Sequence, residues 1–217
     1  MSFPSNYLIG LFFILMLVSC DNSRSYSLEE LENNHYNQLQ MPVEEKFTAE
    51  QYNALFDELY SMSKEELLKR LSAKGLELHV ASFGFYYLAN EYVKEDNWAQ
   101  AIKYHTIAAN NYLNPHSLLK LAELNFFKEK NYAKAYEYLH TSLEVTVEIT
   151  ENNRSHPIAK SGKDKAQFML ETMEKLGNEK AFDKAAVREK LKAELPPLLL
   201  TYREMYGLGP REGEEPS

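Results

Sequence analysis

The chain has 217 residues, of which 44% are hydrophobic and 26% are charged, and its formal net charge is −8. These proportions exclude a largely disordered chain and a protein with many membrane spans, and the length fits about one domain. No block of Lys and Arg accompanies the negative net charge, which argues against a nucleic-acid partner.

Metal binding is not expected either. Cys20 is the sole cysteine, so the chain can hold neither an internal disulfide nor a metal site built from several cysteines. The six histidines lack the spacings that bring two imidazoles to one metal. They are His35, His79, His105, His116, His140 and His156. We therefore expect no metal and no cofactor.

The N-terminus has the pattern of a secretory signal. Residues 7–18 form an uncharged apolar run of 12 residues. This run is shorter than the roughly 20 residues that span a bilayer, and its length is typical of a signal-peptide core. The run ends at Leu17-Val18-Ser19-Cys20, which resembles the lipobox of bacterial lipoproteins.

The lipobox resemblance implies how the N-terminus is processed. Residues 1–19 are expected to be removed, and Cys20 is expected to carry a diacylglyceryl group and a further acyl chain such as palmitate. Two or three acyl chains anchor a protein stably, whereas one chain binds only marginally. Asp21 resembles the signal that retains some lipoproteins in the inner membrane. We therefore expect a protein anchored in the bacterial cell envelope and facing the periplasm.

Two polar segments flank a predicted helical domain at residues 47–206. Residues 20–46 are polar and lack a sustained apolar period, which predicts a flexible tether. Residues 207–217 are rich in Gly, Pro and Glu, which predicts a disordered acidic tail. The domain is expected to begin with two helices that have capping boxes, at Thr48-Ala-Glu-Gln51 and at Ser63-Lys-Glu-Glu66.

An internal repeat predicts the architecture of this domain. Trp98-Ala-Gln-Ala101 recurs 34 residues later as Tyr132-Ala-Lys-Ala135, each copy preceded by an asparagine suited to cap a helix. Small alanines let two antiparallel helices approach closely, and aromatic rings fill the space around them. This pattern resembles the tetratricopeptide repeat, and the drift in its length also resembles the related Sel-type repeat.

The best repeats are expected at residues 83–112 and 116–147, separated by a break at Asn114-Pro115. A degenerate third pair of helices is expected after Pro157, with a last short helix opened by Pro196-Pro197. The fold class is therefore predicted to be all-α, as a short α/α repeat solenoid with capping helices.

No motif for catalysis is present, which favours a protein that binds over one that catalyses. We expect an adaptor or assembly factor for another envelope protein or peptide, an interpretation that rests on fold analogy. Two alternatives stay open: a small envelope enzyme acting on peptidoglycan or peptides, and a cytosol-facing protein on an uncleaved anchor.

The repeat resemblance also implies where a peptide would bind. In tetratricopeptide arrays the first helix of each repeat lines the concave face, which places Tyr86, Asn90 and Lys94 in a groove. Asn90 matches the asparagine that hydrogen-bonds a bound peptide backbone in some family members, since an amide both donates and accepts. Lys128 is expected to add positive charge to the same groove, as Lys94 does.

Overall fold

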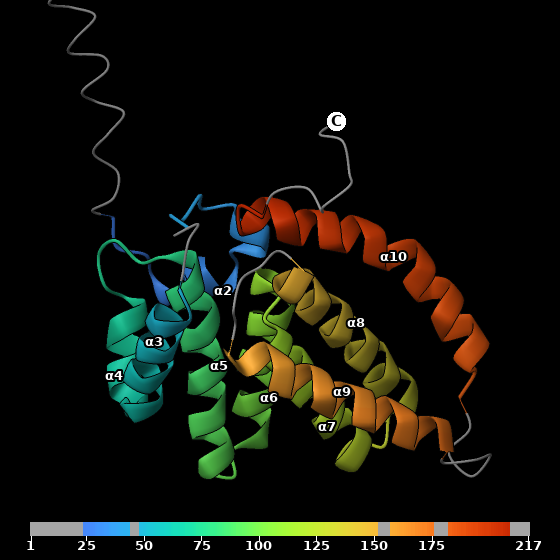
Figure 1. The fold of residues 1–217 in the computed structure, drawn as a ribbon. Helices are drawn as coiled ribbons and strands as arrows, with labels where there is room; N and C mark the ends of the chain where they lie inside the picture. The colour runs from blue at the N-terminus through green and yellow to red at the C-terminus, as the bar shows by residue number, and fades with distance from the viewer. Residues whose placement is uncertain (1–23, 44–47, 152–156, 176–181, 209–217) are drawn as a thin grey trace, which may run out of the picture.

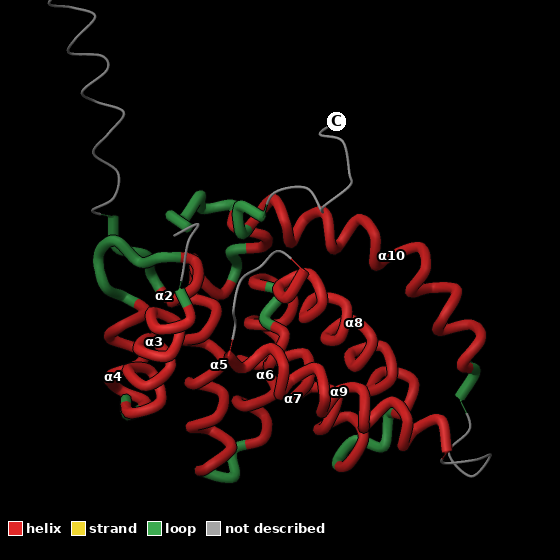
Figure 2. Tube along the Cα trace, in the orientation of Figure 1, coloured by secondary structure: helices red, strands yellow, loops and turns green. Residues whose placement is uncertain are grey.

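A computed structural model describes residues 24–43, 48–151, 157–175 and 182–208, and within these residues the fold is all helical (Figure 2). In chain order the α-helices are α2 (Leu28–Glu32), α3 (Ala49–Ser61), α4 (Lys64–Leu71), α5 (Leu78–Lys94), α6 (Trp98–Tyr112), α7 (Pro115–Phe127), α8 (Tyr132–Glu151), α9 (Pro157–Lys175) and α10 (Lys184–Met205). The predicted fold class, all-α, is thereby confirmed. None of the described helices is both long and apolar enough to cross a membrane.

Two helical hairpins correspond to the two sequence repeats. Helix α5 packs against α6, and α7 packs against α8 (Figure 1). The second helix of each pair starts the same way, because the side chains of Asn97 and Asn131 accept bonds from backbone amides three residues later. Ala101 and Ala135 are fully buried in the two hairpins. The repeated sequence therefore has a local structural counterpart.

The break between the hairpins is formed by Asn114 and Pro115. Asn114 caps α7 by accepting bonds from the amides of His116 and Ser117 at 3.1 and 3.0 Å. Its side-chain nitrogen donates to Ser82 on α5 at 3.0 Å. Pro115 is the first residue of the helix, where its missing N–H is no loss. The same side chain thus starts one helix and fixes it to another.

The first two helices of the domain begin where the capping boxes predicted. Both boxes form, with Thr48 and Gln51 at the start of α3 and Ser63 and Glu66 at the start of α4. Helix α4 then packs closely on α5 at Gly84, where an added Cβ would lie 2.8 Å from a methyl carbon of the buried Leu71.

Helices α9 and α10 do not form the third repeat pair that the sequence suggested. Both pack on α8, and they diverge from each other beyond their connecting segment (Figure 1). The expected short helix at Pro196-Pro197 is also replaced by one continuous helix, Lys184–Met205. The two prolines are exposed, so water can satisfy the carbonyls left without amide partners, and they account for the bend of α10 in Figure 1.

Residues 24–43 differ from the flexible tether expected there. Helix α2 begins with a capping box formed by Ser27 and Glu30, and Leu31 is fully buried. Tyr26 and Met41 are buried as well, and all three side chains belong to the main hydrophobic core. Polar residues between the apolar ones concealed this packing, to which the partly buried Leu28, Leu39 and Val43 also contribute.

Candidate functional site

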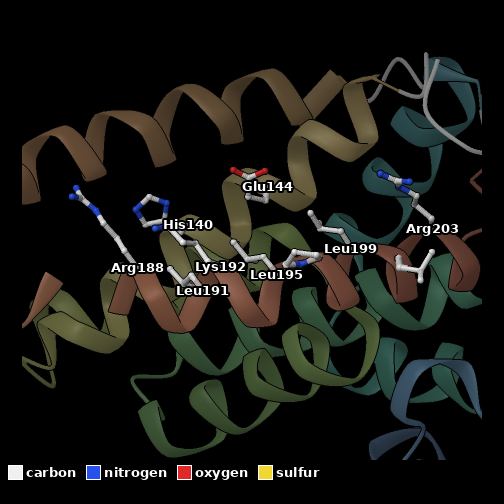
Figure 3. Close-up of a pocket in the computed structure, with 10 residues that line it drawn as sticks. His140, Glu144, Arg188, Leu191, Lys192, Leu195, Leu199 and Arg203 are labelled. Carbon is white, nitrogen blue, oxygen red and sulfur yellow. The ribbon is translucent and has the colours of Figure 1, made fainter. Parts of the chain in front are cut away.

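A groove of about 700 Å³ lies between α8 and α10 (Figure 3). Its volume falls within the range of about 300–1,000 Å³ that ligand pockets in proteins occupy. The lining residues are His140, Glu144, Arg188, Leu191, Lys192, Leu195, Pro196, Leu199, Leu200 and Arg203. Two helices that are separated in the sequence by α9 therefore build one concave surface.

The apolar part of the groove comes from α10. Leu191, Leu195 and Leu199 recur every fourth residue, so they form one stripe along the helix. Leu191 and Leu199 are buried, whereas Leu200 beside them is 55% exposed. The bend at Pro196 lies in the middle of this stripe. The groove thus has an apolar wall that the rest of the chain covers only in part.

The arginines at the two ends of the groove are already engaged by carboxylates. Arg203 donates from Nε to buried Glu148 at 2.8 Å and from a terminal nitrogen to the same carboxylate at 3.2 Å. Arg188 donates to Glu174 at 2.8 Å and to the Tyr136 hydroxyl at 3.0 Å. These two arginines fasten α10 to α8 and to α9, so little of their charge is left for a ligand.

The acceptors in the groove lie on α8. His140 and Glu144 are four residues apart, so they share one face of the helix and lie toward α10 (Figure 3). Burial and the nearby Arg188 lower the pKa of His140, which keeps its ring neutral at pH 7. Its Nε2 atom is buried and has no hydrogen-bond partner within the described residues. A neutral imidazole ring and a carboxylate thus line the α8 side of the groove.

The residues predicted for a groove on α5 do not line this site. Tyr86 is half-buried and its ring lies near those of His105 and His116, at 5.8 and 5.6 Å between centroids, so it faces α6 and α7. Lys94 is exposed, pairs with Glu91 on its own helix and lies 5.7 Å from the centre of the Tyr60 ring.

Asn90 and Lys128 complete the predicted set. Asn90 lies between Tyr86 and Lys94 on α5 and is half-buried. Lys128 follows α7 and lies 4.6 Å from the centre of the Trp98 ring on α6. Three of the four predicted residues therefore share α5, whereas the fourth stacks on another helix. Cys20, the predicted lipidation residue, lies outside the described residues.

Three further histidines are buried in the core. Burial lowers the pKa of His105 to about 3 and that of His116 to about 4, so both rings are neutral at pH 7. His105 contacts the Ser117 hydroxyl at 3.2 Å and thereby links α6 to α7. His79 packs against Tyr52 and Tyr206. These rings are packing elements of the hairpins and lie away from the α8–α10 groove.

The described residues contain no group of His, Cys, Asp and Glu side chains that could hold a metal ion. The leucine stripe on α10 is visible in the sequence as a four-residue period. The facing pair on α8 was missed because nothing local in the sequence indicates which residues of α8 face α10.

No protein-family model, curated protein or solved structure matches this chain. The functional proposal below therefore depends on the geometry and chemistry of the groove.

Proposed function

We propose that this protein is a lipid-anchored envelope protein that acts as an adaptor or assembly factor, binding an apolar segment of another envelope protein. The observation that carries the binding role is the groove between α8 and α10, with its partly exposed apolar wall and the Glu144 carboxylate. A groove of this size with an apolar wall and a few polar groups is typical of a binding site. The lipid anchor at Cys20 rests on the lipobox alone.

The chemistry of the groove favours one kind of segment. Leu195 and Leu200 offer apolar contact along one side, and Glu144 offers an acceptor on the other, beside the neutral His140 ring. A segment with apolar side chains and one Lys or Arg satisfies both sides, because its cation can donate to the carboxylate. The net charge of −8 favours the approach of such a cationic segment.

Lipidation is tested with a Cys20→Ala variant. The unaltered protein should take up labelled palmitate and accumulate as its precursor under globomycin, which blocks the lipoprotein signal peptidase. The variant should take up no palmitate and should be uncleaved or mislocalised, with or without globomycin. If the variant is processed and partitions into detergent as the unaltered protein does, the lipoprotein assignment is wrong.

Binding is tested with a photo-crosslinking amino acid placed in living cells. The probe replaces Leu200, which is exposed within the groove, and in a matched control it replaces Phe127, which is 60% exposed elsewhere. We expect the Leu200 probe to crosslink a discrete segment that contains apolar residues and a Lys or Arg. Glu144→Gln should reduce that yield, and the equally conservative change Glu129→Gln in the loop after α7 should not.

Two outcomes would overturn the binding role of the groove. One is an equal yield of the same products from the Leu200 and Phe127 probes. The other is an unchanged yield in the Glu144→Gln protein and in a Leu195→Asp protein that keeps its helical circular dichroism. Crosslinks from a probe at Asn90 instead would assign binding to α5, the surface that the repeat resemblance implied.

A further inference from the structure

The N-terminal segment is fixed to the domain from Arg24 onward. The carbonyl oxygen of Arg24 accepts a hydrogen bond from the amide of Gly75, at 3.2 Å, in the loop between α4 and α5. Farther along, the carbonyl oxygen of Pro42 accepts a bond from the amide of Leu78, at 3.0 Å, where α5 begins. Both ends of the segment are therefore bonded to the same part of the domain.

The middle of the segment is held by buried contacts with α6. The Tyr112 hydroxyl donates to the carbonyl oxygen of Leu31 at 2.7 Å, and Leu31 itself is fully buried. The side chain of Asn111 donates to the carbonyl oxygen of Glu32, whose carboxylate pairs with Lys103 at 2.9 Å. A buried hydrogen bond and a buried leucine hold a segment far more firmly than exposed ion pairs do.

These contacts limit the length of chain between the lipid and the folded domain. Only residues 21–23 separate Cys20 from Arg24. Four residue steps span at most about 14 Å, even when fully extended. A flexible tether over residues 20–46 would reach several times farther, about 90 Å at full extension.

We propose that the domain is held directly at the membrane surface, with the loop of residues 72–77 next to the lipid headgroups. This inference rests on the proposed lipidation of Cys20. The loop carries the exposed Lys74 and the carboxylate of Glu77, and it is bonded to Arg24, whose half-exposed side chain pairs with Glu30 at 2.6 Å. The placement therefore follows from the short connection to Cys20, and Lys74 adds a cation that can meet an anionic headgroup.

The test uses the full lipoprotein in vesicles of phosphatidylcholine and phosphatidylglycerol that carry a nitroxide on some headgroups. Because lipid occupies Cys20, a single new cysteine can be labelled with a fluorophore. Lys74→Cys places the label in the loop before α5, and Ala99→Cys places it on an exposed residue just beyond the other end of that helix. The length of α5, 17 residues, separates these two ends by about 25 Å.

We expect strong quenching at Lys74→Cys and quenching near background at Ala99→Cys. Inserting a Gly/Ser segment of about 20 residues between Ser23 and Arg24 should abolish this difference, since it adds about 25 Å of mean reach. A Leu31→Asp variant that retains its helical circular dichroism should also lose most of the difference, because it releases the segment from the core.

Other results overturn the inference in distinguishable ways. Equal quenching at the two positions, or a difference that the insertion leaves unchanged, shows that the loop is not held at the membrane although the protein is anchored. If mass spectrometry finds no acyl groups and the protein does not float with the vesicles, the proposed lipoprotein function fails, and the inference fails with it.

Discussion

The ion pair between Arg203 and Glu148 provides the sharpest test of how α10 is attached. The Glu148 side chain is completely buried and that of Arg203 is 14% exposed. Replacing Arg203 by Met keeps much of the side-chain volume but leaves a buried carboxylate without its cation. Breaking a buried pair in this way costs about 3–5 kcal/mol. For a domain of this size, each kcal/mol lowers the Tm by about 2–4 °C, so a fall of roughly 6–20 °C is expected.

The measurement is thermal and urea unfolding, followed by circular dichroism. Arg203→Met with Glu148→Met should recover most of the loss, because a buried apolar pair replaces the ion pair without leaving a lone charge. The matched control is Lys192→Met, which removes a cation whose partner Glu189 is largely exposed; it should change little. An Arg203→Met protein as stable as the unaltered one, or a double variant no better than the single, would refute the buried pairing.

Three further predictions concern the core. The pKa values of His105 and His116 are lowered to about 3 and about 4 from an ordinary value of 6.5. The two histidines therefore contribute their full stability above pH 6.5, and each contribution falls by about 1.4 kcal/mol per pH unit as the pH drops toward the lowered pKa. Urea unfolding midpoints measured between pH 7 and pH 4 should fall accordingly. In His105→Asn the midpoint should depend less steeply on pH. Gly84→Ala should destabilise the protein by about 1–3 kcal/mol in urea unfolding, because its Cβ would overlap the buried Leu71. Trp98→Ala should lower the free energy of unfolding by less than the roughly 3–5 kcal/mol that removal of a buried aromatic ring costs, because Trp98 is only half-buried. A loss of about 3 kcal/mol or more would contradict this and would show that the ring is part of the core.

Short-range signals predicted the helical parts of the fold well. The capping boxes at Thr48 and Ser63 and the asparagine caps at Asn97 and Asn131 form because each depends on a side chain and an amide three residues away. Such local geometry can be predicted without any knowledge of the rest of the fold.

Long-range packing accounts for the errors. Pro196 and Pro197 would break many helices, yet α10 continues through them because this stretch is exposed, so water can satisfy the carbonyls left without amide partners. Residues 24–43 looked like a tether because their apolar side chains follow no sustained helical or strand period. Their packing depends on partners such as Tyr112, which lies 81 residues after Leu31.

The same limit applies to the candidate site. The leucine period on α10 is local and could be predicted, whereas the facing residues His140 and Glu144 lie some fifty residues earlier on α8. The α5 surface was deduced from the repeat resemblance. That resemblance places each residue only by its position along the aligned repeat. Register correctly placed Tyr86, Asn90 and Lys94 on one helix. It carried no information about the Tyr86 ring, which lies against His105 and His116.

The groove follows from the way α9 and α10 depart from a regular hairpin. In a packed pair, the apolar stripe of α10 would be covered along its length by its neighbour. Here α9 packs on α8 instead, and within the described residues Leu191 and Leu199 of the stripe are buried, whereas Leu195 is half-buried and Leu200 beside the stripe is 55% exposed. The ion pairs of Arg188 and Arg203 fix the two ends of the groove wall to carboxylates on neighbouring helices. With both ends fixed, α10 holds Leu195 and Leu200 at the groove, where a partner of matching chemistry can cover them.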